Sequence, residues 1–342
     1  MGARSDLKAC EAARVKDAAR IAELEAEVAA LKNPPPPPPP DPEPEPITQT
    51  FAAPWRPDAL WSQPATGRAL HPNSAAMIAD FIYRAGNRNS CLSWTNFGVP
   101  VVPARTDGKG YVIKSSTGWA VNTNDAGPVP IPDGVVLPSG SDKHLCIWDA
   151  QTHRAWDLND AVYYPDSDTW TASSGSTYTT DHRDGITPEK NEWGSKLAGA
   201  TSANFPLLGG LIRPEEIHAG RIEHALVFAT PVRGYYHVNP ATHHGGNLTP
   251  NYGAITEGHH LKLDMSETEI NALQVAAWNK TVLIALAEFG MLFRDGGGGF
   301  SILAENPVNR FTTYPSAIQG TTYPVLSVPW SRLRVLAVPG GA

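Results

Sequence analysis

The chain has 342 residues, with 27 Lys and Arg against 34 Asp and Glu, and a formal net charge of −7. This acidic balance with scattered basic residues argues against nucleic acid as a partner. No apolar run approaches the roughly 18 residues that a membrane span needs, so we expect none. Cys10, Cys91 and Cys146 are too few and too dispersed for a disulfide framework or a zinc site. We therefore expect neither a bound metal nor a cofactor.

Residues 1–33 have the heptad pattern of a coiled-coil helix, which predicts an oligomerising and anchoring stem. Its apolar seam, at heptad positions a and d, consists of Ile21, Leu24, Val28 and Leu31. Arg14 and Asp17 interrupt the same seam earlier in the helix. β-Branched residues at a with Leu at d favour a parallel dimer, and a trimer stays open. The alternative is a single amphipathic helix that lies on another protein.

Residues 34–50 predict a linker, whose stiff part is the proline-rich segment 34–46. Proline fixes φ and has no backbone N–H, so this segment cannot continue a helix or join a sheet interior. We expect a polyproline II rod on the order of 40 Å long. A ligand for an SH3-like domain is the alternative, but Asp41, Glu43 and Glu45 make the flank acidic rather than basic.

Residues 51–342 predict one β-rich head domain. Turn residues separate many short β-type segments, as in an antiparallel sandwich, and we expect a jelly-roll-like arrangement. The predicted strands are Gly110–Lys114, Leu145–Ala150, Ala155–Leu158, Ala161–Tyr164, Thr169–Ala172, Ile222–Thr230, Gly234–Val238, Leu261–Leu263, Met291–Arg294, Phe300–Leu303 and Leu333–Val338.

A few peripheral helices complete the head. Ser74–Arg84 has one apolar face, and Ser266 with Glu269 forms a capping box before a helix that begins at about Glu267. A third helical pattern runs from Trp278 to Phe289 and ends at Gly290. Pro214–Ala219 reads as a single helical turn.

Several motifs occur in a fixed order over residues 130–340. They are Pro138-Ser-Gly-Ser-Asp142-Lys-His144-Leu-Cys-Ile-Trp-Asp149, Ala155-Trp-Asp-Leu158, Leu207-Leu-Gly-Gly-Leu-Ile-Arg-Pro-Glu-Glu216, Ala219-Gly-Arg-Ile-Glu-His224 and Ala287-Glu-Phe-Gly-Met-Leu-Phe-Arg-Asp295-Gly-Gly. This order resembles a family of actinobacterial secreted proteins and actinobacteriophage minor tail or fibre proteins. The resemblance implies a context and assigns no catalytic residues. A stem and spacer stand where secreted relatives would carry a signal peptide, which favours the phage branch.

The first candidate site is Asp142 with His144, followed by Asp149. Alternation along a strand would put Asp142 and His144 on one face, where they could bind a divalent cation or a sugar hydroxyl. The structural alternative is a turn-capping Asp142 and a hydrogen-bonded His144.

The second candidate site is a histidine-rich segment around His243 and His244, with His259 and His260 downstream. Its spacing fits no established zinc motif, so a polar groove for a glycan is the functional interpretation and a structural role the alternative. Aromatic rings also suit sugar C–H surfaces. Among the aromatic residues we select Trp193 and Tyr236, although most aromatic residues pack in cores.

Glu223 and His224 are adjacent on a predicted strand and would face opposite sides, so we expect a structural His224 held by a backbone carbonyl. Motifs for a nucleophile or a phosphate-binding loop are missing. Paired carboxylates for glycoside hydrolysis stay open, with Asp181, Asp184 and Glu223 as candidates.

The sequence therefore predicts a phage virion fibre or minor tail protein, made in the host cytoplasm and located on the tail or capsid exterior. We expect it to be a homo-oligomer through residues 1–33, attached to other virion proteins, with a head that binds host cell-surface polysaccharide. One alternative is an envelope-glycan depolymerase or hydrolase. Another is a purely structural capsid or tail decoration protein.

Overall fold

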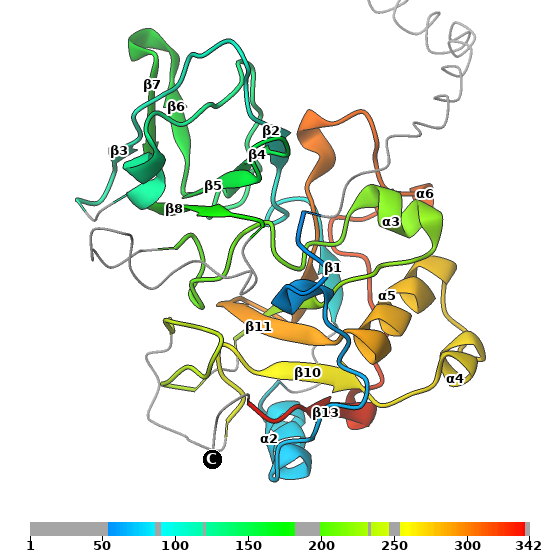
Figure 1. Cartoon of the computed structure of the whole chain (residues 1–342). Coiled ribbons are helices and arrows are strands. Elements are labelled where there is room, and N and C mark those ends of the chain that lie inside the picture. The colour runs from blue at the N-terminus through cyan, green and yellow to red at the C-terminus, as the bar shows by residue number, and fades with distance from the viewer. Residues whose placement is uncertain are drawn as a thin grey trace, which may run out of the picture. The chain divides into compact units, whose positions relative to one another are not determined.

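The computed structural model of the chain describes residues 54–85, 90–118, 121–181, 199–231, 234–245 and 254–338 (Figure 1). The predicted stem and linker lie outside these ranges, so the seam residues Ile21, Leu24, Val28 and Leu31 stay a prediction. No helix in the described part of the chain has the length and apolar character that crossing a membrane requires.

The main sheet has six strands in the order β1-β12-β9-β11-β10-β13. The pairs β1–β12 and β9–β11 are parallel, and the other neighbours are antiparallel. Its strands are β1 (Cys91–Ser93), β9 (Leu226–Thr230), β10 (His260–Leu263), β11 (Met291–Gly296), β12 (Ser301–Leu303) and β13 (Leu333–Val335).

Two smaller sheets come from the chain between β1 and β9. The second sheet has the order β2-β4-β5-β8, and the third has the order β3-β7-β6. Each begins with one parallel pair, β2–β4 or β3–β7. Their strands are β2 (Val101–Pro103), β3 (Lys114–Ser115), β4 (Leu145–Asp149), β5 (Arg154–Asn159), β6 (Val162–Tyr164), β7 (Thr169–Ala172) and β8 (Ser174–Thr179).

The predicted class, mainly β with few helices, is confirmed. The predicted antiparallel arrangement is wrong, because all three sheets are mixed. Each parallel pair joins segments that are distant in the sequence, and only antiparallel neighbours can be linked by a tight hairpin. Local composition predicts that a segment forms a strand, but not whether that strand runs parallel or antiparallel to its neighbours. The jelly-roll-like arrangement is not confirmed by these sheets.

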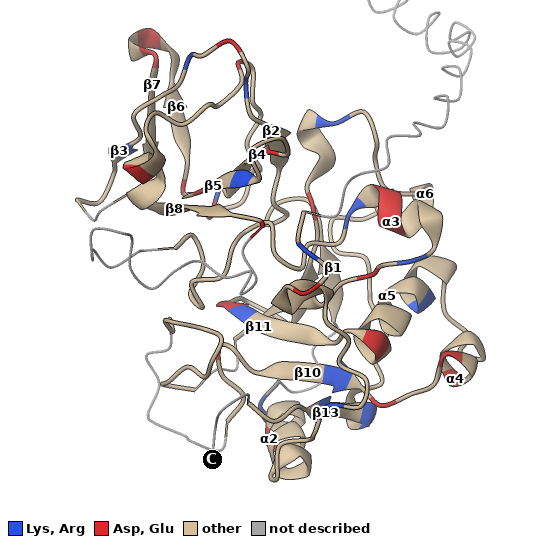
Figure 2. Cartoon of the chain, in the orientation of Figure 1, with Lys and Arg blue, Asp and Glu red and all other residues tan. Residues whose placement is uncertain are grey.

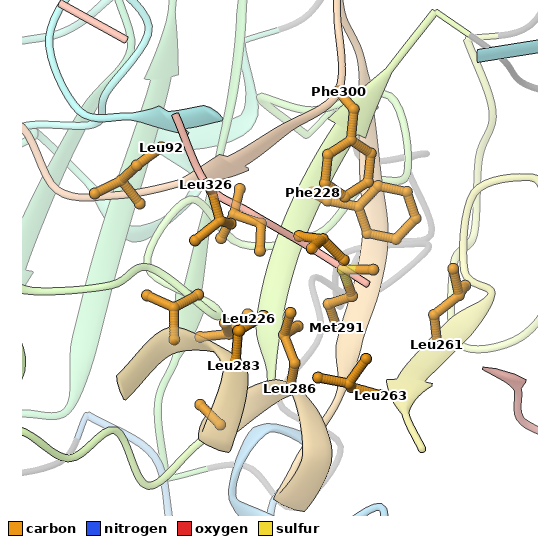
Figure 3. Close-up of a cluster of buried hydrophobic side chains, with 14 of the residues drawn as sticks. Leu92, Leu226, Phe228, Leu261, Leu263, Leu283, Leu286, Met291, Phe300 and Leu326 are labelled. Carbon is orange, nitrogen blue, oxygen red and sulfur yellow. The ribbon is translucent and has the colours of Figure 1, made fainter. Parts of the chain in front are cut away.

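The main sheet is buried on both faces, and side-chain alternation along β9 shows how. Leu226 and Phe228 point into a core that includes residues of α2 (Ser74–Ala85) and α5 (Ala277–Glu288). Figure 3 shows Leu226 near Leu283 and Leu286 of α5, and Phe228 beside Phe300. Val227 and Ala229 point the other way, into a core shared with the second sheet. Successive side chains of a strand alternate between faces, so one strand serves both cores.

The second sheet repeats this arrangement through β4. Cys146 and Trp148 join the core shared with the main sheet, whereas Leu145 and Ile147 join a core shared with the third sheet. Strands buried on both faces read as continuous apolar runs, which is why Leu145–Trp148 lacks the polar–apolar alternation of a half-exposed strand.

The predicted helices are confirmed. Ser266 Oγ accepts from Glu269 N at 3.2 Å, and Glu269 Oε2 accepts from Ser266 N at 2.8 Å, which makes the expected capping box. Gly290 follows α5 with φ of 76°, a value that favours glycine. The other α-helices among the described residues are α3 (Pro214–Ala219), α4 (Glu267–Asn271) and α6 (Ser316–Gln319).

Some strand predictions fail in detail. Gly234–Val238 forms no strand, and the predicted strand Ile222–Thr230 begins only at Leu226. The sequence also gave no prediction of β1, β2 or β8. β8 (Ser174–Thr179) begins with the small residues Ser-Gly-Ser, yet it pairs with β5 along its full length. Pairing with a central strand here outweighs weak β-propensity.

Phe228 provides a stability test of the helix-side core. It is fully buried, and its ring lies 4.9 Å from that of Phe293 and 5.3 Å from that of Phe300. Phe228→Ala should reduce the free energy of unfolding by about 3–5 kcal/mol in urea titrations, because it leaves a cavity. Phe311, which is 97% exposed, is the matched control, and Phe311→Ala should change stability by less than about 0.5 kcal/mol. Equal effects of the two substitutions would contradict this core.

Candidate functional site

A cavity of about 490 Å³ lies between one edge of the main sheet and the loop that precedes β4. Asp142 and His144, two of the predicted site residues, line it together with Asp295 from β11. The sequence predicted the first two as a site. It did not predict that Asp295, more than 150 residues later in the chain, would join them.

Small side chains on one face of the main sheet leave room for the cavity. Cys91 of β1 pairs with Ser301 of β12, which pairs with Ala229 of β9, so the three lie in a row across the sheet. The next residues along, Leu92, Ile302 and Phe228, point to the opposite face and fill the helix-side core. Large side chains therefore cover the helix side of the sheet, whereas the small side chains on the other side leave space for the cavity.

A β-bulge in β11 positions Asp295. Phe293 pairs with Phe228, and the next partner of β9, Ala229, pairs with Asp295, so Arg294 is an extra residue in β11. If β11 paired one residue to one with β9, Arg294 would lie opposite Ala229, and Asp295 would point into the helix-side core with Phe293. The bulge turns Asp295 toward the cavity instead, and bulges often re-aim side chains beside functional sites.

The carboxyl group of Asp295 is held by backbone donors. Its Oδ1 accepts from Gly296 N at 2.8 Å and from Ser202 N at 3.3 Å. Burial raises the pKa of Asp295 above its usual value, although the neighbouring Arg294 guanidinium and these N–H groups oppose the rise. Asp295 is thus a carboxyl group in a desolvated position at the cavity wall.

Four consecutive glycines, 296–299, follow Asp295 and form part of the wall. A Cβ on Gly297 would lie 3.3 Å from the Ala229 Cβ, which is a tight contact. A Cβ on Gly298 or Gly299 would meet nothing within 4 Å, so the absence of side chains leaves space for a ligand at this part of the wall.

Asp142 lies on a loop that is fixed on both sides. Its carbonyl oxygen accepts from Asp160 N at 2.6 Å, and the next residue, Lys143, has a left-handed φ of 37°. On the other side, Gly140 approaches the Asn96 carbonyl so closely that a Cβ there would lie 2.2 Å from the oxygen. This contact brings the Asp142 loop against the turn that carries Phe97.

His144 is buried, and its Nε2–H donates to the Ala200 carbonyl at 3.1 Å. Burial, with the positive charge of Arg294 as the second cause, lowers the pKa of His144 to about 4, so the ring is neutral at pH 7. Strand β4 begins only at Leu145, so the expected alternation of Asp142 and His144 on a strand is wrong. Asp149 caps the turn after β4, where its Oδ1 accepts from Gln151 N, and it does not line the cavity.

Aromatic rings from two other loops complete the cavity. Phe97 is 36% exposed and Tyr323 is 40% exposed, and both line it. The sequence pattern favoured other aromatic residues, because nothing local to Phe97 or Tyr323 shows that these two rings meet. Trp193, one of those selected, lies outside the described residues.

The histidine-rich segment is linked to the cavity but does not line it. His243 Nδ1–H donates to the Ser202 carbonyl at 2.9 Å, and Ser202 N donates to Asp295. The ring of His244 lies 5.9 Å from that of His243 and 5.3 Å from that of Tyr235. Tyr236 donates its hydroxyl to the Ala254 carbonyl at 3.1 Å. Ser202 therefore joins the predicted histidine-rich segment to Asp295 at the cavity.

His224 has the structural role that the sequence predicted. Its Nδ1 contacts the Ala225 carbonyl at 2.9 Å, and its Nε2 contacts Glu216 Oε1 at 2.9 Å. Both partners accept, so both ring nitrogens must be protonated, and the pKa of His224 is raised by Glu216 against its burial. Glu223 pairs instead with Arg221.

The earlier carboxylate candidates do not meet in the cavity. Neither Asp181 nor Glu223 lines it, and Asp184 lies outside the described residues. Among the residues that the structure describes, no three His, Cys, Asp or Glu side chains are grouped to hold a metal ion.

No protein-family model matches this chain, and no curated protein or solved structure is significantly similar to it. The resemblance to actinobacterial and phage proteins therefore stays a prediction.

The buried neutral His144 gives a pH-dependent stability. The unfolded chain takes up a proton at this ring near pH 6.5, whereas the folded chain does so only near pH 4. Stability from this residue is therefore lost as the pH falls from about 6.5 to about 4. His144→Gln should make the unfolding free energy less dependent on pH in that interval, as measured by urea titrations. The control is His153→Asn, at an exposed turn position, which should keep the wild-type slope. An unchanged slope for His144→Gln would contradict the assignment.

Proposed function

We propose that the protein is a phage virion fibre or minor tail protein whose head binds host cell-envelope polysaccharide in the cavity beside Asp295. The observation that supports this most is the combination of lining groups. Two partly exposed aromatic rings, two carboxyl groups and a glycine backbone converge on one hollow of about 490 Å³.

These groups suit a sugar for specific reasons. The rings of Phe97 and Tyr323 can cover apolar C–H faces. Asp142 and Asp295 can accept hydrogen bonds from hydroxyl groups, and the glycine loop leaves space for the sugar beside them. The volume is within the range of about 300–1,000 Å³ that is common for small-ligand sites.

The stem and the spacer support the virion role. A coiled coil over residues 1–33 would join two or three heads, and a polyproline linker over residues 34–50 would hold them away from the particle. Joined heads that bind one polymer gain affinity through effective concentration, even where each site is weak. A site of weak affinity that binds through hydrogen bonds also fits the small polar side chains of the cavity, such as Ser93 and Ser141.

The stem is tested in the full chain by one seam substitution. Leu24→Asp places a charge in the predicted seam and should convert a dimer or trimer into a monomer in multi-angle light scattering. Ala26→Asp puts the same side chain on the predicted outer face, at heptad position f, and should leave the oligomer intact. A wild-type monomer, or an oligomer that survives Leu24→Asp, would contradict the predicted stem.

Binding is tested by retention of the full chain on purified actinobacterial cell walls. Phe97→Ala and Asp295→Asn should each weaken retention by about tenfold, because each removes a lining group. Phe311→Ala and Asp166→Asn are the controls, since both residues are exposed and neither lines the cavity. If all four substitutions leave retention unchanged, the cavity is not the binding site. No retention at all would favour a purely structural decoration protein.

A hydrolase is the second candidate, because two carboxyl groups in different surroundings line one cavity. The raised pKa of Asp295 suits a general acid that protonates the leaving oxygen while water attacks the sugar, with Asp142 as the second carboxyl group. The same wall incubations distinguish the candidates. New reducing ends that Asp295→Asn abolishes would show hydrolysis, and intact polymer would show binding alone.

A further inference from the structure

The charge of the cavity narrows the class of sugar that it can accept. Among its described lining residues, the acidic side chains are Asp142 and Asp295, and none is Lys or Arg. His144 adds no positive charge at neutral pH, because its pKa is lowered to about 4. Burial raises the pKa of the Cys91 thiol, which keeps that group neutral.

The nearest buried cation does not change this balance at the wall. Arg294 is only 1% exposed, and its Nη1 donates to the Leu207 carbonyl at 3.1 Å, within the protein. It does not line the cavity. In Figure 2 the end of β11 carries a basic and an acidic band side by side, and the acidic residue is the one at the wall. The bulge thus places the guanidinium inside and the carboxyl group at the cavity.

The hydrogen-bonding groups of the cavity wall favour the same kind of ligand as its charge does. Each carboxylate oxygen accepts and cannot donate. One Asp142 oxygen already accepts from Ser141 Oγ at 2.8 Å, and Asp295 Oδ1 accepts two backbone N–H groups, so each carboxyl group keeps acceptor capacity. A ligand has to supply donors, and an anionic group would face like charge in a partly desolvated site.

We infer that the cavity recognises a sugar unit without anionic groups and prefers one that carries a free amine, whose N–H groups donate to Asp142 and Asp295. The inference rests on the proposed glycan binding and specifies its chemistry. It excludes phosphate-bearing and uronate-bearing polymers as the ligand of this cavity.

The test is calorimetric titration of the full chain with three oligosaccharides of equal length. The probes are a chitosan hexamer with free amines, a neutral chitin hexamer and an anionic oligogalacturonate hexamer. At low ionic strength the chitosan hexamer should bind about tenfold more tightly than the chitin hexamer, and the oligogalacturonate should not bind. High salt should narrow the difference, because salt screens charge.

Matched variants assign the preference to the cavity. Asp142→Asn and Asp295→Asn should each bring the ratio of the chitosan and chitin affinities toward one. Asp166→Asn removes the same charge at an exposed position that does not line the cavity, and should keep the wild-type ratio. A ratio that responds equally to all three would overturn the inference, because it would reflect net charge alone.

The outcomes separate this inference from the proposed function. Oligogalacturonate that binds best, and that Phe97→Ala weakens, would overturn the charge preference and leave glycan binding in place. If none of the three hexamers binds but native wall polysaccharide does, the charge of the bound polysaccharide distinguishes the outcomes. A bound fraction that is retained on an anion exchanger is anionic and overturns the inference. A bound fraction that is not retained supports the inference. Failure of every glycan to bind would overturn both.

Discussion

The β-bulge at Arg294 is the constraint on which the cavity depends. An unbroken β11 would set Arg294 opposite Ala229 and turn the Asp295 carboxyl group into the core with Phe228 and Phe293. An unpaired charge in an apolar core is strongly unfavourable. The extra residue puts both side chains on the face toward the second sheet. There Arg294 donates to a backbone carbonyl, and Asp295 accepts from backbone N–H groups. Arg294 donates to the Leu207 carbonyl, while Leu207 N donates to Asp157 Oδ2 at 2.7 Å, so the same contacts tie the two sheets together.

The cavity lies where packing between those two sheets runs out. Over most of the interface large side chains such as Trp61 and Trp148 fill the space. Toward β1 the main sheet presents mostly small side chains, including Cys91 and Ser301, with the larger Leu303 beside them, and the loop of Asp142 covers the gap. The face of the main sheet toward the second sheet is therefore part of a core where its side chains are large and a cavity wall where they are small. The histidine-rich segment adjoins this region through Ser202, which ties the second predicted constellation to the cavity without adding to its wall.

Much of the fold could be predicted from local signals, and the site only in part. The capping box at Ser266 and the glycine after α5 are local, so the helices were predictable. Asp142 and His144 were predictable as a site because they stand together in the sequence, although for the wrong reason, since neither lies on a strand. Asp295, Phe97 and Tyr323 reach the cavity only through strand pairing and a bulge, which composition does not encode. An acidic residue followed by four glycines directly after an apolar strand was the available signal.

In the proposed site, sugar binds against Phe97 and Tyr323 with its donors toward the carboxyl group of Asp295. A crystal structure of the full chain with an oligosaccharide from host cell wall tests this most directly. We predict density for a sugar ring in the cavity, within hydrogen-bonding distance of Asp142 or Asp295. Sugar bound elsewhere on the head, for example along His243 and His244, with the cavity unchanged, would contradict it.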